Sequence, residues 1–189
     1  AGFVIGFVDR TQVKGAKNVK VGDVILGLSS SGFHSNGYSL VRKLVEKENL
    51  NPSDKPSFSK ETWSEVLLKP TYLYNKKLEP VLTYINALAH ITGGGLYENL
   101  PRILPETVTA EISESKWQLP ELFQWAQKSA GISTRQLLST FNCGIGMILI
   151  CSEENAKVVT NHFESDKISI RTLGHITERK SEPVIWIEK

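Results

Sequence analysis

The chain has 189 residues, of which 40% are hydrophobic and 22% are charged, so it is long enough for one domain with a buried core and unlike a disordered or fibrous protein. Its 22 Lys and Arg residues and 20 Asp and Glu residues are mixed along the chain, which argues against a nucleic-acid partner. No apolar run approaches the roughly 20 residues of a membrane-spanning helix, and we expect no membrane partner.

The first residues and the two cysteines bear on the origin of the chain. It opens AGFVIGFVDR, without an initiator methionine or the features of a signal peptide. We therefore expect a piece of a longer protein whose upstream segment is missing. Cys143 and Cys151 flank one apolar run and have no metal-type or disulfide-framework spacing. We expect reduced thiols in a cytoplasmic protein.

The spacing of apolar residues predicts a mixture of strands and helices. In chain order we predict strands at 2–10 and 23–30, helices at 38–48, 61–70 and 73–85, a strand at 87–92, a short helix at 96–103, a strand at 107–113, helices at 120–130 and 133–141, a strand at 144–152, a helix at 152–163, and strands at 167–178 and 183–189. Strands and helices do not alternate strictly, which favours an α+β layered sandwich.

The turn SSSGFHSNG lies between a predicted strand and a predicted helix. A strand that leads into a helix N-terminus presents unpaired N–H groups and the positive end of the helix dipole to an anion. His34 is a candidate catalytic residue that could donate a hydrogen bond to a phosphate or to a polar substrate group. Candidate substrate contacts are Ser31, Gly32, Ser35 and Asn36. The alternative is that Ser35 or Asn36 only caps the helix.

A second turn, HITGGGLYENLPR, contains three successive glycines. Glycine loses much conformational entropy on folding, so three together indicate positive φ angles or close contact with a ligand. The spacing matches neither a P-loop nor a dinucleotide-binding motif. His90 is a second candidate catalytic residue, and the alternative is a tight turn with a buried histidine. Candidate substrate contacts are Thr92, Gly93, Gly94, Gly95, Asn99 and Arg102.

A third turn, TFNCGIG, precedes the most apolar predicted strand. Asn142 is a third candidate catalytic residue, and Gly146 indicates a bulge or a close approach of another backbone. Cys143 could be a nucleophile, but no activating base is evident, and a small buried residue is the favoured interpretation. We predict no metal site, because His162 and His175 stand apart from these turns and are interpreted as surface or core residues and not as metal ligands.

Four motifs in this order, GLSSSGFHSNGYSLVRKL, LLKPTYLY, AHITGGGLYENLPRILP and STFNCGIGMIL, resemble the phosphoribosylformylglycinamidine cyclo-ligases, also called aminoimidazole ribonucleotide synthetases. The resemblance extends over nearly the whole chain. It implies a three-layer α/β/α sandwich with a mixed sheet. It also implies purine synthesis, in which formylglycinamidine ribonucleotide and ATP yield aminoimidazole ribonucleotide, ADP and phosphate.

The resemblance also implies what this chain lacks. The family's N-terminal domain, which binds ATP and Mg²⁺ and makes most of the dimer contact, has no counterpart in the sequence. Residues 1–189 would then be a single C-terminal substrate-binding domain, inactive as an isolated fragment. Its partners would be its own N-terminal domain and a second copy in a homodimer. The alternatives are the C-terminal half of another ATP-dependent superfamily member, or a ligand-binding module without chemistry of its own.

Overall fold

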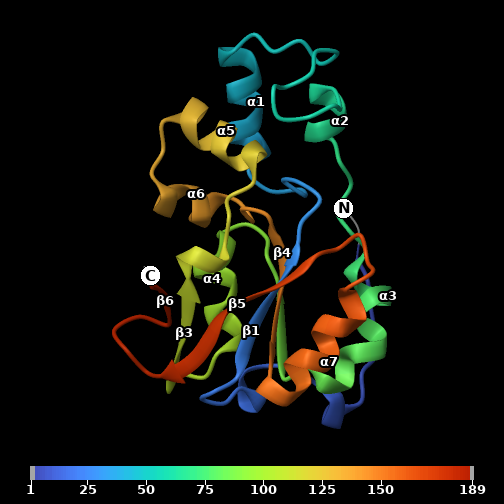
Figure 1. Ribbon diagram of the computed structural model, residues 1–189, viewed down its shortest axis with the longest axis vertical. Coiled ribbons are helices and arrows are strands. Elements are labelled where there is room, and N and C mark those ends of the chain that lie inside the picture. Colours follow the sequence, from blue (N-terminus) through green and yellow to red (C-terminus); the bar gives the residue numbers. More distant parts are fainter. Residues whose placement is uncertain (1–2, 188–189) are drawn as a thin grey trace.

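We describe a computed structural model of the chain, which covers residues 3–187 (Figure 1). Six strands form one sheet in the order β2-β4-β1-β5-β3-β6. Their bounds are β1 Val24–Ser29, β2 Ala87–His90, β3 Val108–Ser113, β4 Ile145–Cys151, β5 Ile170–Glu178 and β6 Val184–Ile187. Neighbouring strands are antiparallel except for β3 and β6, which are parallel. The predicted mixed sheet is confirmed.

Helices cover both faces of the sheet. They are α1 Tyr38–Lys47, α2 Trp63–Leu67, α3 Tyr74–Leu78, α4 Gly95–Asn99, α5 Glu121–Ala130, α6 Thr134–Thr140 and α7 Glu153–Phe163. One apolar core joins one face of the sheet to α1, α4, α5 and α6, and a second joins the other face to α3 and α7. Figure 1 shows α3 and α7 together on one side of the sheet. The three-layer α/β/α sandwich is therefore confirmed.

The central strands β1 and β4 explain why two cores form. Leu26 of β1 and Leu149 of β4 point into the core under α7, whereas Ile25 and Ile148 point into the core under α5 and α6. Side chains on successive strand residues point to opposite faces, so a strand buried on both faces reads as a continuous apolar run. This is why β1 and β4 are the most apolar predicted strands.

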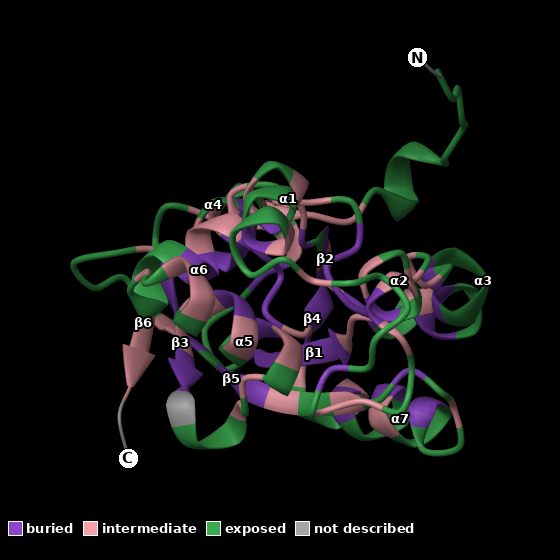
Figure 2. Ribbon diagram, turned by 90° about the horizontal axis from the view of Figure 1, so that it is seen from above, coloured by how far each residue is buried: buried purple, intermediate pink, exposed green. Residues whose placement is uncertain are grey.

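The predicted strand at 2–10 is wrong over the residues that the structure describes. Residues 3–9 have no regular secondary structure, and Phe3, Val4 and Phe7 are 95 to 99% exposed. Figure 2 shows this segment projecting away from the body of the domain. A strand needs a neighbour to satisfy its N–H and C=O groups, and within the described chain this segment has no such neighbour.

Helix α1 starts at Tyr38, as predicted, but its cap is not a polar side chain. Its N-cap is Gly37, with φ +70°, and no side chain caps the helix. The alternative interpretation, a cap by Ser35 or Asn36, is therefore wrong, and capping does not account for these two polar side chains. By contrast, the backbone N–H of Asn155 donates to Ser152 Oγ at 3.3 Å, so a serine side chain caps α7.

Candidate functional site

The first turn begins where β1 ends and is held in place by Asn142. This residue is fully buried. Its Oδ1 accepts hydrogen bonds from Ser30 Oγ and from the Gly144 backbone N–H, and its Nδ2 donates to the Gly32 carbonyl, all at 2.9 Å. The bonds to Ser30 and Gly32 join the segment before β4 to the first turn, and the bond from Gly144 is local. Asn142 therefore fixes the shape of the first turn, and its side-chain oxygen and nitrogen are already hydrogen-bonded within the protein.

His34 occupies the centre of this turn. Its side chain is only 4% exposed, and its φ of +56° lies in the left-handed region that few side chains other than Asn and Asp adopt. The Ser31 backbone N–H donates to His34 Nε2 at 3.1 Å. Because Nε2 accepts, the neutral ring carries its proton on Nδ1. Nδ1 is buried and has no hydrogen-bond partner among residues 3–187.

Three aromatic rings form a triangle around His34. The ring centroids of His34, Tyr74 and His90 lie 6.1 Å apart in each of the three pairs. The Tyr74 hydroxyl donates to the Ser29 carbonyl at 2.7 Å. The two predicted catalytic histidines, which come from different strand ends, are thus brought together. Tyr74 was missed, although it lies in the LLKPTYLY motif.

Gly146 makes room for this triangle. A Cβ at Gly146 would overlap the Tyr74 hydroxyl and would lie 2.6 Å from His34 Cε1. The pairing of β1 with β4 shifts register here, with Leu28 opposite Met147 and Ser29 opposite Ile145. The predicted bulge is therefore confirmed. The close neighbours of Gly146 are aromatic side chains, not the expected backbone.

Burial controls the protonation of the three rings. Burial, and to a lesser extent the neighbouring His90, lowers the pKa of His34 from 6.5 to about 4. Burial also lowers the pKa of His90 and raises that of Tyr74. At neutral pH the three rings are therefore uncharged, and the Nδ1–H of His34 is a neutral, buried donor.

Asn99 holds the glycine turn together. It is 4% exposed. Its Nδ2 donates to the Gly93 carbonyl at 3.1 Å and to the Gly95 carbonyl at 2.7 Å, and its Oδ1 accepts from Thr92 Oγ1 at 3.1 Å. The side chain of Asn99 thus closes the turn on itself.

The three glycines differ in their surroundings. A Cβ at Gly95, which has φ +58°, would overlap the Leu138 carbonyl of α6, so close packing accounts for this glycine. Gly94 has φ +89° and is the N-cap of α4. Gly93 is exposed and has open space around it, and the nearest atom to its Cβ position is Asn36 Oδ1 at 4.0 Å. The two predicted turns therefore lie side by side.

Arg102 lies at the edge of this arrangement. Its side chain is 63% exposed and approaches Glu98 at 3.9 Å, a pair spaced by four residues along the chain. Its Nη1 also donates to Asn99 Oδ1 at 3.5 Å. An exposed ion pair of this kind contributes little to stability, so the guanidinium remains available to an anion at the glycine turn.

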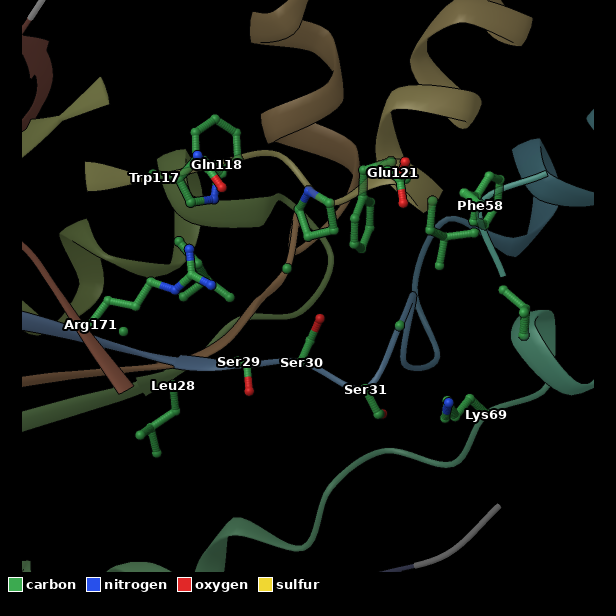
Figure 3. A pocket seen from close by; sticks show the side chains of 18 of the residues that line it. Leu28, Ser29, Ser30, Ser31, Phe58, Lys69, Trp117, Gln118, Glu121 and Arg171 are labelled. Atoms are coloured by element: carbon green, nitrogen blue, oxygen red, sulfur yellow. The ribbon is translucent and has the colours of Figure 1, made fainter. Parts of the chain in front are cut away.

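A pocket of about 310 Å³ borders the first turn (Figure 3). Its walls include Ser29 to Gly32, Trp117 and Arg171. Neither His34 nor His90 lines it. Sequence reasoning missed this pocket, because its walls come from five separate segments of the chain. Cys143 lies nearby, but burial raises the pKa of its thiol, which agrees with the favoured buried interpretation.

Among the side chains that the structure describes, no group of three or more His, Cys, Asp or Glu is placed to hold a metal ion. None of the helices that the structure describes is both long and apolar enough to cross a membrane.

The chain spans about half the length of the curated relatives it matches. It is 43% identical to a phosphoribosylformylglycinamidine cyclo-ligase of Neisseria meningitidis serogroup B, over 96% of this chain and 53% of the relative. Enzymes of the same name from Lawsonia intracellularis and Rippkaea orientalis are 40% and 43% identical, over 95% and 98% of this chain and 52% and 55% of the relatives.

Solved structures share the fold at low sequence identity. A thiamine-monophosphate kinase from Stenotrophomonas maltophilia has a TM-score of 0.64 at 16% identity, over 95% of this chain and 54% of the other. The hydrogenase maturation protein HypE in complex with ATP has a TM-score of 0.63 at 19% identity, over 93% and 50%. The family described as AIR synthase related protein, C-terminal domain, matches residues 20–187. The chain therefore belongs to this family.

Proposed function

We propose that the chain is the substrate-binding half of a phosphoribosylformylglycinamidine cyclo-ligase, which converts formylglycinamidine ribonucleotide and ATP to aminoimidazole ribonucleotide, ADP and phosphate. The observation that carries the proposal is the 40 to 43% identity to enzymes of this name over nearly the whole chain. The structural neighbours, at under 25% identity, support the fold alone.

In this proposal His34 supplies a hydrogen bond to the reacting end of the substrate. Its buried Nδ1–H has no partner within the described chain, and a buried donor without a partner carries a desolvation cost that a ligand acceptor would remove. The formyl oxygen is an acceptor that gains charge as the ring closes, and a fixed donor stabilises such charge. His90 borders the same space and would orient the amidine.

Two asparagines act as positioning residues. Asn142 ties the first turn to β4, and Asn99 ties the glycine turn together. Since both side chains are buried and bonded, we assign Asn142 a role in holding the His34 turn in place of the predicted direct catalytic role. This arrangement lowers the entropy lost when the reacting groups are brought into line.

Substrate contacts come from the exposed parts of both turns. Ser35 and Asn36 do not cap α1, and Gly93 faces open space beside Asn36. We propose that the ribonucleotide lies across these residues, with Thr92 and Arg102 at its phosphate end. Ser31 Oγ already donates to the Pro70 carbonyl at 2.6 Å, so Ser31 and the buried Gly32 would contribute backbone shape.

We propose that ATP and Mg²⁺ are held by the half of the enzyme that this chain does not contain. The described residues lack a cluster that fits a metal ion, and the chain has no nucleotide-binding glycine motif. ATP supplies the phosphoryl group that activates the formyl oxygen. The missing half would also be a partner of the exposed segment at Phe3 to Val8 and would carry the homodimer contact.

The two free cysteines support a cytoplasmic location.

The test is an assay of the full-length parent with ATP and formylglycinamidine ribonucleotide. We expect release of ADP and formation of aminoimidazole ribonucleotide by the parent, and no ADP release above background by the 189-residue chain alone. Ring closure without added ATP, or ADP release that does not depend on this ribonucleotide, would contradict the proposal. A parent that binds the ribonucleotide but never closes the ring would favour a binding module.

A further inference from the structure

The pocket beside the first turn holds a cation without a partner. Arg171 lies on β5 and lines the pocket. Arg171 is exposed, and none of the described side chains or backbone groups makes a hydrogen bond or an ion pair with its guanidinium. The other cation in the wall, Lys69, is bound by both carboxylate oxygens of Glu61, at 2.7 and 2.9 Å. Only one of the two positive charges in the pocket is therefore neutralised within the described chain.

The rest of the wall is a mixture of hydroxyl and apolar groups. Figure 3 shows Arg171 extending toward Trp117 and Gln118, on the same side of β1 as the Ser30 hydroxyl, with Glu121 on the opposite side of the pocket. Trp117 is held rigidly, because its Nε1–H donates to the Cys143 carbonyl at 3.2 Å and its ring packs on Trp186. The apolar part of the wall comprises Phe58, Val66, Pro120, Leu122, Ile145 and Leu173.

We propose that this pocket is a second binding site, separate from the substrate site, for a small organic anion. Its carboxylate or phosphate group would pair with Arg171, which binds such groups through two parallel hydrogen bonds. Its apolar body would lie against Trp117 and Leu173. The volume, about 310 Å³, matches the lower end of ordinary ligand pockets, roughly 300 Å³.

The position of the pocket links it to the proposed substrate site. Ser31 lines the pocket, and its backbone N–H donates to His34 Nε2. A ligand beside Arg171 therefore touches the same turn that orients His34. The proposal of a second binding site does not rest on the proposed reaction, because none of His34, Tyr74 and His90 lines this pocket.

The proposal can be tested by NMR titration of the isotope-labelled 189-residue chain. The probes are benzoate and phenyl phosphate, which separate a carboxylate from a phosphate source, and inorganic phosphate, which lacks an apolar body. The readout is the indole N–H signal of Trp117, assigned with Trp117→Phe. We expect saturable shifts with at least one organic anion and much weaker binding of inorganic phosphate.

Charge variants separate this site from non-specific binding. Arg171→Gln should raise the Kd of the organic anion by about 10-fold or more, and Arg171→Lys by less. Arg10→Gln makes the same change of charge at an exposed residue outside the pocket and should leave the Kd unchanged. No saturable shift with either organic anion, an equal loss in Arg10→Gln, or an unchanged Kd in Arg171→Gln would overturn the proposal. Loss of binding in His34→Asn but not in Arg171→Gln would also overturn it.

Discussion

The side chain of His34 couples the stability of the domain to pH. Burial holds its folded-state pKa at about 4, below the ordinary 6.5. Above pH 6.5 the ring is neutral in both states and its contribution is complete. As the pH falls through 6.5 toward 4, the unfolded state takes up a proton that the folded state does not, so stability decreases. We expect His34→Asn to flatten the fall of the melting temperature between pH 6.5 and 4.

The matched control is His175→Asn, at an exposed histidine on β5. This variant should keep the slope of the parent. Asn tolerates the left-handed backbone that His34 adopts, and the measurement is a slope, so a uniform loss of stability in His34→Asn does not confuse the result. An unchanged slope in His34→Asn would mean that other groups carry the pH dependence.

Tyr74 provides a second test at the level of one residue. Tyr74→Phe keeps the ring but removes the hydroxyl that donates to the Ser29 carbonyl. We expect a loss of about 1 kcal/mol, which lowers the melting temperature by about 2–4 °C in a domain of this size. In the full-length enzyme we also expect a lower kcat/KM, because the end of β1 leads into the His34 turn. A lower melting temperature with unchanged kinetics would limit Tyr74 to a structural role.

The difference between His34 and Tyr74 shows what residue patterns reveal about a site. The histidine stands in a turn of small residues and was predicted from the residue types around it. Tyr74 lies at the start of a predicted helix with apolar neighbours, where a tyrosine usually belongs to the core. The Tyr74 hydroxyl fits at the site because Gly146, at the bulge, has no side chain. The sequence of one strand does not show which side chain will contact such a bulge.

Within the glycine turn, we expect one alanine substitution to lower the stability of the domain and another to leave it nearly unchanged. Gly95→Ala places a methyl group against the Leu138 carbonyl and forces alanine to a φ of +58°, so we expect a loss of roughly 1–3 kcal/mol. Gly93→Ala meets open space, and its φ lies outside the positive range. Thermal melts of the 189-residue chain should show a lower melting temperature for Gly95→Ala and little change for Gly93→Ala.

The variants Gly93→Ala and Gly95→Ala also distinguish a role in packing from a role in substrate binding. In the full-length enzyme, Gly93→Ala should weaken ribonucleotide binding while ATP affinity stays nearly constant, since its added methyl group faces the space beside Asn36. Unaltered ribonucleotide affinity in Gly93→Ala would remove the glycine turn from the site. The result would then assign all three glycines to the folding of α4.

Secondary structure followed the sequence for most strands and helices that pack inside the domain, although the predicted helix at 73–85 is divided into α3 and a 3-10 helix, Glu79–Tyr84. The apolar run of β4 and the serine before α7 were sufficient, because local pattern and tertiary packing agree there. The segment at 2–10 has the same local pattern as a strand, but pairing is a tertiary property, and the described chain offers no partner. Sequence periodicity alone does not distinguish these two cases.

For the whole molecule, the exposed opening segment predicts different effects in the two forms of the protein. Phe7 is 99% exposed in the 189-residue chain, so Phe7→Ser should leave its melting temperature unchanged. In the full-length parent, where we propose that this segment is covered, burial of a Phe contributes about 1.5–3 kcal/mol. We expect Phe7→Ser to lower the melting temperature of the parent. Equal behaviour in both forms would mean that the missing half does not cover Phe7.

The order of the strands also determines when the domain can complete its fold. β1 is the third strand in the sheet, and its two neighbours are β4 and β5. Only β6 follows these two strands in the sequence, so the ribosome synthesises them late. Pairing over such long sequence separations is slow, because loop-closure entropy is lost before contacts compensate for it. The apolar strand β1 therefore has no native neighbour until residues 145–151 have been synthesised, and it lacks the second until residue 178. During that interval the apolar segment VILGL of the nascent chain has no native strand to pair with.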